Sequence, residues 1–336
     1  MTVPYMTRSY RLRRKNLYEY PYHFYLSTKK AFAGDIQTQT ALGLWYERFW
    51  TWAPNVEEAN RNKEKALYWY TMAANQGTAI EKEQLATFYY HLGTDEATRQ
   101  EYVTRAIYWY EQAAIQGLAT AQYLLAYQYE IGEGVAEDEK KALYWYEKAA
   151  LQGYSPAQNN LGHFYELGKG VPQDYHTALS WYQKAADQGN SDGQCNVAIM
   201  YQFGYAGEQS YEKAIYWYQK AAAHSMAIAQ NNLGWLYENG LGCHQDYTKA
   251  RYWYQKAAER SDPPALDNLG RLYLEGLGVE QDGNTAFPYF LEAAQHDYAP
   301  AMRHLAMCYE KGWAVTANAT IAAYWNTRAD ETPDWE

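Results

Sequence analysis

The sequence predicts an all-α protein built from about eight stacked helix-turn-helix repeats. Tryptophans recur every 36 residues at Trp109, Trp145, Trp181, Trp217 and Trp253. The same interval then reaches Tyr289 and Trp325, and Trp69 lies 40 residues before the first of these tryptophans. A fixed interval of this length is typical of small units that each contact mainly their neighbours. Such a fold shifts the functional question from a reaction to a binding partner.

The repeat that spans residues 154–189 shows how each unit is built. Its first half places apolar residues on one helical stripe at Ala157, Leu161, Phe164 and Tyr165. We call this predicted helix A. Gly168 and Gly170 follow it, and both permit a turn with positive φ.

The second half of the same repeat predicts helix B, which begins after Asp174 and closes at Gln188 and Gly189. Its stripe consists of Ala178, Trp181, Tyr182, Ala185 and Ala186. The position of Ala178 is alanine in all eight repeats, at Ala66, Ala106, Ala142, Ala178, Ala214, Ala250, Ala286 and Ala322. We expect the helices to approach too closely there for a larger side chain.

Two further columns support the same architecture. Helix A carries a column of small residues at Gly43, Ala86, Ala126, Gly162, Ala198, Gly234, Gly270 and Ala306. Glycine inside a helix costs about 1 kcal/mol relative to alanine, so its return predicts a close neighbour. Helix B is preceded by Asn62, Tyr102, Asp138, Asp174, Ser210, Asp246, Asp282 and Asn318. All of these except Tyr102 are good N-cap residues.

The repeats divide the chain into approximate segments at 35–77, 78–117, 118–153, 154–189, 190–225, 226–261, 262–297 and 298–330. The first has seven extra residues between its helices and the second has four. Residues 1–34 are predicted to form a basic N-terminal arm and a capping helix. Residues 331–336 form an acidic tail. Atypical polar ends are what a repeat array needs to stay in solution.

The charge is unevenly distributed. The formal net charge is −10, which disfavours nucleic acid as a partner. Residues 1–34 hold seven Lys or Arg and one acidic residue, so the remaining chain has 22 basic and 38 acidic residues, a net charge of −16. An acidic body favours a partner with a basic surface.

The cysteines and the apolar runs limit the location of the chain. Cys195, Cys243 and Cys308 are far apart, odd in number and without a CxxC pair. This favours a reducing compartment over a disulfide scaffold or a zinc site. No apolar run approaches 18 residues, so no membrane insertion is expected. The early basic residues lack an apolar stretch after them, and the sequence predicts a cytoplasmic protein without a cleaved signal.

The chain shows none of the common catalytic motifs. It contains no P-loop, GxGxxG, HExxH or GxSxG pattern. His163 and His176 lack metal-ligand spacing, and Asn318, although within a glycosylation sequon, is better explained as a helix cap. We therefore expect no catalytic residue, no metal and no cofactor.

The segment LGHFYELGKGVPQDYHTALSWYQKAADQG resembles the Sel-one-like repeat (SLR), a relative of the tetratricopeptide repeat with a longer inter-helix loop. The pattern of LG, Tyr, GxGV, Asp, KA, WY and KAA recurs over about residues 35–330. The resemblance implies a right-handed α/α superhelix and a non-enzymatic adaptor or scaffold, most often bacterial. Some members of the family accompany toxins as immunity proteins. Function varies widely within such repeats.

The related tetratricopeptide fold implies a concave groove lined by helix A. Residues two before and two after the LG leucine would face it. The candidate groove residues are Tyr123, Tyr127, Asn159, His163, Ile199, Asn231, Trp235, Asp267, Arg271 and Met307. Five positions after the leucine, Tyr90, Glu130, Glu166, Gln202 and Glu238 predict an acidic edge. The column two after the leucine differs in every repeat although its neighbours recur, as expected of a surface that recognises a partner. The alternative is that superhelical twist partly buries this column.

A second candidate surface is the predicted inter-helix loop from Arg48 to Pro54. Its three aromatic residues are Phe49, Trp50 and Trp52. Loops carry function more freely than stacked helices. The alternative, which the sequence favours slightly, is that these rings fold back and close the N-terminal end of the core.

Three functional hypotheses remain. The first is a non-catalytic, cytoplasmic monomer or weak dimer that binds a protein or peptide in its groove. Its sharpest version is an immunity protein that neutralises a secreted toxin, and its alternative is a scaffold in signalling or envelope assembly. The second is an enzyme with a site assembled from distant repeats. The third, a nucleic-acid reader, would show only salt-sensitive binding by the N-terminal arm.

Overall fold

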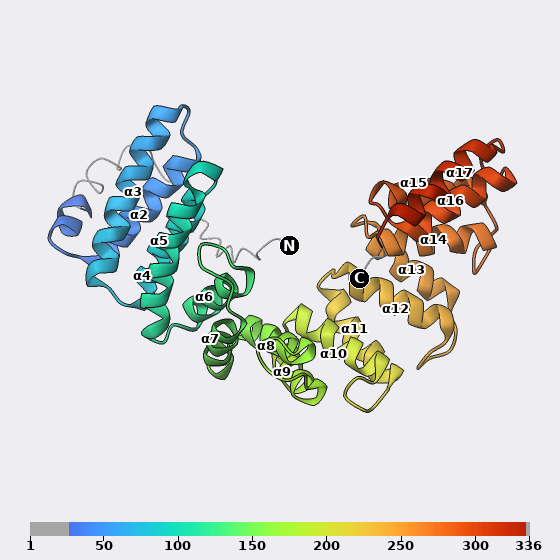
Figure 1. Cartoon of the computed structure of the whole chain (residues 1–336), viewed down its shortest axis with the longest axis horizontal. Helices are drawn as coiled ribbons and strands as arrows, with labels where there is room; N and C mark the ends of the chain where they lie inside the picture. Colours follow the sequence, from blue (N-terminus) through green and yellow to red (C-terminus); the bar gives the residue numbers. More distant parts are fainter. Residues whose placement is uncertain (1–26, 334–336) are drawn as a thin grey trace. The chain divides into compact units, whose positions relative to one another are not determined.

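The computed structural model describes residues 27–333, in which all regular secondary structure is helical (Figure 1). Most of the predicted basic arm and residues 334–336 of the predicted acidic tail lie outside the described residues. Residues 27–32 form a short helix. The helices that follow are α2 (Ile36–Thr51), α3 (Val56–Gln76), α4 (Ala79–Leu92), α5 (Glu96–Ile115), α6 (Ala119–Ile131), α7 (Glu139–Leu151), α8 (Ser155–Leu167), α9 (Tyr175–Asp187), α10 (Ser191–Phe203), α11 (Tyr211–Ala223), α12 (Ala227–Asn239), α13 (Tyr247–Ala258), α14 (Pro263–Glu275), α15 (Gly283–Gln295), α16 (Ala299–Lys311) and α17 (Ala319–Glu331).

The chain divides into two compact units. The described part of the first runs from residue 27 to 138 and contains α2 to α6, and the second runs from residue 139 onward and contains α7 to α17. Within each unit, every helix packs on the next one in the sequence, so helix A contacts helix B of its own repeat and helix B contacts helix A of the following repeat. This pairing confirms the predicted all-α solenoid.

The ends of the helices follow from residues that the repeat supplies. Gly168 ends α8 in the left-handed conformation, with φ of +73°, and its N–H donates to the Phe164 carbonyl. Asp174 then caps α9, because its carboxylate accepts from the N–H groups of His176 and Thr177. The same capping bond is made by Ser210, Asp246, Asp282 and Asn318, as predicted.

The prediction that Asn62 caps a helix is wrong. The extra residues of the first two repeats extend helices and do not form loops. Asn62 lies inside α3, which instead begins after Asn55, and Tyr102 lies inside α5, which begins after Asp95. Both helices start seven residues earlier than predicted. Seven residues are close to two full helical turns, so the added segment keeps the buried face of the helix in register.

The two small-residue columns lie where helices approach most closely. The invariant alanines are buried in every repeat. At Gly234 of α12, an added Cβ would lie 2.7 Å from the ring of Tyr254 on α13. Gly43, Gly162 and Gly270 face the ring of Tyr70, Tyr182 and Phe290 in the same way. The glycines of helix A therefore make room for a buried aromatic ring of helix B, as the sequence predicted.

The turn between α12 and α13 also requires a glycine. Gly242 has φ of +69°, and a Cβ there would lie 2.6 Å from the carbonyl carbon of Tyr211, at the start of α11. The turn of one repeat thus packs directly on helix B of the repeat before it. Gly153 has a similar φ of +86° but nothing within 4 Å of its added Cβ.

We therefore expect Gly242→Ala to destabilise the protein more than Gly153→Ala does. Both variants place a side chain at positive φ, which costs about 1–2 kcal/mol. Only the first also clashes with neighbouring backbone, which adds about 1–3 kcal/mol. Urea unfolding followed by circular dichroism measures the difference. Equal losses of stability would show that the turn moves freely away from α11.

The capping aspartates predict a pH dependence of stability. Hydrogen bonds donated by the first helical turn lower the pKa of Asp174 and Asp246, mainly from the Thr177 hydroxyl and the Lys249 N–H, respectively. A lowered pKa in the folded state gives stability that is present above the unfolded value of about 3.9 and is lost as the pH falls through the folded value. Between pH 5 and pH 3 we expect the melting temperature to fall less steeply when both residues are changed to Asn.

Asn is as good an N-cap as Asp, and it does not titrate. At pH 7 the Asp174→Asn, Asp246→Asn double variant should therefore melt close to the wild type. If the melting temperatures of the two proteins fell equally between pH 5 and pH 3, the assignment of these carboxylates as stabilising caps would be wrong.

Candidate functional site

The predicted groove residues all lie on A helices. Tyr123 and Tyr127 belong to α6 in the first unit. The others lie in the second unit, with Asn159 and His163 on α8, Ile199 on α10, Asn231 and Trp235 on α12, Asp267 and Arg271 on α14, and Met307 on α16. In the second unit the structure brings several of these into a row of polar contacts that crosses from one repeat to the next.

The row consists of contacts between successive A helices at three junctions: α8 with α10, α12 with α14, and α14 with α16. Asn196 Nδ2 donates to Asn159 Oδ1 at 2.9 Å, and Asn268 Nδ2 donates to Asn231 Oδ1 at 3.0 Å. At the following junction His304 Nδ1 lies 2.6 Å from Asp267 Oδ1. We call these three contacts the polar ladder. They fix adjacent A helices side by side, so Asn159, Asn231 and Asp267 have a structural role at these junctions.

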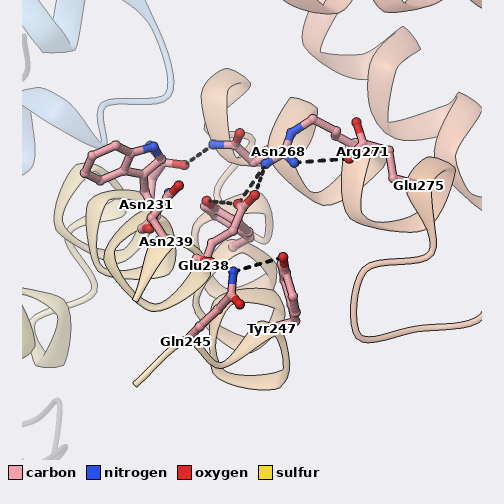
Figure 2. A network of polar contacts seen from close by, with 10 residues as sticks. Asn231, Glu238, Asn239, Gln245, Tyr247, Asn268, Arg271 and Glu275 are labelled. Carbon is pink, nitrogen blue, oxygen red and sulfur yellow. Dashed lines mark hydrogen bonds and ion pairs between the residues drawn. The ribbon is translucent and has the colours of Figure 1, made fainter. Parts of the chain in front are cut away.

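Arg271 is also held by neighbouring side chains. Its Nη2 donates to both carboxylate oxygens of Glu238, at 2.7 Å to Oε2, and its Nη1 lies 3.7 Å from Glu275 Oε2. Figure 2 shows Arg271 of α14 directed at Glu238 of α12, beside the Asn231–Asn268 contact. The salt bridge therefore joins the same two repeats as one rung of the polar ladder.

Glu238 also accepts a hydrogen bond from helix B of its own repeat. Tyr254 OH of α13 donates to Glu238 Oε2 at 2.7 Å. Burial, assisted by the Glu238 carboxylate, raises the pKa of Tyr254, so the hydroxyl stays protonated and acts as a donor. In the preceding repeat Tyr218 OH donates to Gln202 Oε1 at 2.7 Å. Gln202 and Glu238 are both buried, so the predicted acidic edge of the groove is wrong at these two positions.

The apolar candidates differ in how far they are covered. Trp235 is 38% exposed, and it is the exposed aromatic side chain among the groove candidates. Ile199 and Met307 are partly buried and pack against the core. Tyr127 and His163 are half-buried. Partial burial of this column is what the alternative interpretation of the sequence expected.

The second candidate surface is not a loop. Phe49 and Trp50 belong to α2, and Trp52 ends it, so the prediction of an inter-helix loop was wrong. The Trp50 ring is half-buried and lies 5.9 Å from the ring of Phe88. Phe49 and Trp52 are exposed, and Arg48 lies over the Trp52 ring. Within residues 27–333, therefore, only Trp50 packs inward as the alternative expected.

The sequence reasoning missed the partners that complete the polar ladder. Asn196, Asn268 and His304 stand one residue before the helix A leucine or its equivalent, in a column that is polar in five successive repeats. This recurrence was the available signal. A column that repeats a hydrogen-bonding side chain is typical of contacts between repeats.

Cys195 and Cys308 are free cysteines whose side chains are buried. Burial raises the pKa of the Cys195 thiol to about 12 and that of Cys308 to about 11, which keeps both thiols protonated and unreactive near neutral pH. No group of three or more potential metal ligands occurs among residues 27–333. None of the helices described there combines the length and apolar character needed to cross a membrane.

The salt bridge can be tested through a double-mutant cycle. Arg271→Met leaves the buried Glu238 carboxylate without its cation, and we expect a loss of about 3 kcal/mol in the free energy of unfolding. When Glu238→Gln is also present, the same substitution should cost less than about 1 kcal/mol. A glutamine needs no cation beside it, as Gln202 shows: it accepts a hydrogen bond from the equivalent tyrosine, Tyr218, and pairs with no arginine in the described part of the chain. Urea denaturation of the four proteins gives the coupling energy. A coupling near zero would mean that Arg271 is not engaged with Glu238.

The whole chain was compared with known proteins. The Sel1 repeat family matches residues 58–78, 84–118, 119–154, 155–190, 191–226, 227–262, 263–298 and 299–329. A comparison with curated proteins found no match.

Among solved structures, the chain is similar to c5321, described as a protective antigen of uropathogenic Escherichia coli with an SLR fold. The two are 31% identical with a TM-score of 0.78, over 91% of this chain and 64% of c5321, so this chain spans less than two thirds of that protein's length. A Sel1 repeat protein from Oxalobacter formigenes is 30% identical with a TM-score of 0.67, over 73% of this chain and 99% of its own.

An immunity protein from Pseudomonas aeruginosa, Pa5087, is 20% identical with a TM-score of 0.39, over 73% of this chain and 81% of its own, a likeness too low to carry an argument. The family match, by contrast, covers most of the residues from 58 to 329. The chain therefore belongs to the Sel1 repeat family.

Proposed function

We propose that this protein binds a partner protein through the A-helix surface of its second unit, with Trp235 at the centre of the contact. Sel1 repeat proteins mediate protein–protein interactions, and their solenoid fold is typically non-catalytic. The observation that carries the proposal is an exposed tryptophan on a rigid polar frame. Aromatic side chains of this kind dominate binding energy when they are presented on a preorganised surface.

The frame around Trp235 is fixed by contacts on both sides. Asn231, one turn before it on α12, accepts from Asn268, and Glu238, nearly one turn after it, holds Arg271. Asn239 Nδ2 donates to the Trp235 carbonyl at 2.8 Å, which secures the C-terminal turn of α12. Little side-chain entropy remains to be lost on binding, which favours affinity.

The charge of the chain supports a partner with a basic surface. Outside residues 1–34 the net charge is −16, so a cationic protein would be attracted over a distance of about 8–10 Å at physiological salt. The sharpest form of this proposal is an immunity protein that occludes a basic toxin in the cytoplasm, acting as a monomer or weak dimer. A scaffold for signalling or envelope assembly is the second candidate, because the same surface would serve either role.

Trp235→Ala is the variant that tests the proposed surface. We expect it to weaken binding about 10-fold to 100-fold, because a central tryptophan typically contributes about 2 kcal/mol or more. Tyr144→Ala is the matched control, since Tyr144 is also an exposed aromatic residue of the second unit but lies on a B helix, α7. Affinity purification with tagged wild-type and variant proteins, read by quantitative mass spectrometry, measures the loss.

One stoichiometric partner that the Trp235 variant loses and the Tyr144 variant retains would support the proposed surface, and inhibition of that partner's toxicity would support the immunity role. Several substoichiometric partners lost together with Trp235 would favour the scaffold. A partner retained by the Trp235 variant would place the interaction elsewhere on the molecule.

A further inference from the structure

A second surface, on the B helices of the second unit, differs from the proposed groove. At three successive junctions there, a glutamine near the start of helix A (Gln158, Gln194 or Gln230) donates to a carbonyl at the end of the preceding B helix. Gln158 Nε2 donates to the Ala150 carbonyl at the end of α7, and Gln158 Oε1 accepts from Gln188 Nε2 at 2.6 Å. Gln188 lies at the end of α9, 30 residues later, so the bond joins three successive helices.

The next two junctions lack the second of these bonds. At the first of them Gln194 Oε1 is buried without a hydrogen-bond partner among the described residues, and His224 takes the position of Gln188. In the second, formed by α11, α12 and α13, an arginine takes that position. Gln230 occupies the position of Gln158 and still donates to the Ala222 carbonyl at 3.2 Å. The position of Gln188, however, is taken by Arg260. Gln230 Oε1 is buried and has no hydrogen-bond partner within the described residues. The exposed Arg260 side chain forms no salt bridge or hydrogen bond there either.

The same junction differs at the residue that follows α11. The earlier repeats place a glycine at this left-handed position, whereas Ser225 stands here with φ of +62°. In the next two repeats the equivalent residues bridge to the following B helix: Ser261 donates to Glu292, and Asp297 accepts from Arg328. The corresponding partner of Ser225 would be Lys256, but Lys256 instead pairs with Glu259 at 3.0 Å.

The unmade contacts leave an open hollow of about 640 Å³. It is lined by Ala222, Ala223, Ser225, Gln230, Tyr252, Trp253, Lys256, Glu259 and Arg260. Tyr252 is exposed and Trp253 is half-buried, with their rings 5.0 Å apart and edge to face. The hollow thus combines two aromatic rings with two cations: the unpaired guanidinium of Arg260 and the ammonium group of Lys256, which pairs with Glu259.

Helix α13 is unusually basic for this acidic chain. It carries Lys249, Arg251 and Lys256 without any acidic residue. The basic surface is short, however, because Arg251 lines a separate hollow together with Glu280 and Asp282. A nucleic acid requires an extended basic track, whereas a short acidic peptide needs only one or two cations beside apolar surface.

We propose that the hollow between α11 and α13 binds an acidic peptide segment of a partner protein. A carboxylate pairs with the Arg260 guanidinium, and Lys256 supplies a second cation. An apolar or aromatic residue beside the carboxylate packs on Tyr252 and Trp253. The site is independent of the groove, so one molecule can hold a basic partner on its A helices and an acidic segment on its B helices.

Arg260→Gln is the decisive variant, because it restores the residue found at Gln188. It removes the free cation and allows the new amide to donate to Gln230 Oε1. The probe is a fluorescein-labelled hexapeptide with three glutamates around one tryptophan, and binding is followed by fluorescence anisotropy. We expect Arg260→Gln to weaken binding at least about tenfold, as expected for loss of a charge-assisted hydrogen bond, and Lys256→Gln to weaken it less.

Arg251→Gln is the matched control, since it removes the same charge from the same helix but faces the other hollow. We expect it to change the affinity less than about threefold. The melting temperature of Arg260→Gln should equal or exceed that of the wild type, which separates a lost site from a damaged fold. Equal losses in the Arg251 and Arg260 variants, or no binding by the wild type, would overturn the proposal. So would equal binding of the glutamine version of the peptide, or displacement of the peptide by a short oligonucleotide.

Discussion

The rest of the solenoid depends on the contact made by the buried aromatic ring of helix B, which belongs to a tyrosine in six repeats and to Phe290 in the seventh. In four repeats this ring lies against a glycine of helix A, so close at Gly234 that a methyl group does not fit without movement. Where the ring is a tyrosine, its hydroxyl needs a partner, because a buried polar group without a hydrogen bond is costly. Tyr218 donates to Gln202 in its own repeat and accepts from Asn232 of the next one. One side chain thus fixes both the pairing within a repeat and the stacking between repeats.

This constraint limits what each A helix can offer a partner. The residue five after the leucine is committed to the tyrosine, as at Glu238, and the residues around it form the polar ladder. In a linear array stability is approximately the sum of such local terms, so a side chain that leaves the ladder weakens one junction rather than the whole chain. Variation is therefore tolerated where a side chain faces away from these contacts, and Trp235 is at such a position.

The fold was predictable because its determinants recur in the sequence. The invariant alanines, the turn glycines and the capping residues each act within one repeat or between neighbours. The same contact therefore recurs along the chain, and the sequence shows it as a column of identical or similar residues. The candidate site was less predictable because its chemistry lies in single departures from those columns. Asn62 is an example: it occupies a capping column, yet α3 begins two turns earlier, after Asn55. Similarly, the sequence predicted Glu238 to be an exposed acidic residue, whereas its side chain is buried and paired with Arg271.

Departures from a column are also the informative positions for function. A substitution that preserves the contact, such as Gln202 in place of Glu238, keeps the hydrogen bond from the buried tyrosine. A substitution that abandons the contact frees both of its former partners, as Arg260 does when it leaves Gln230 Oε1 unpaired. Other contacts between repeats hold the structure around the open junction, such as the bond from Gln194 to the Ala186 carbonyl and the Asn231–Asn268 contact. A rigid surround keeps the freed charges and rings in place, and a preorganised site loses little entropy when it binds. The array can therefore acquire a local binding site on a B helix without changing the frame that supports Trp235 on an A helix.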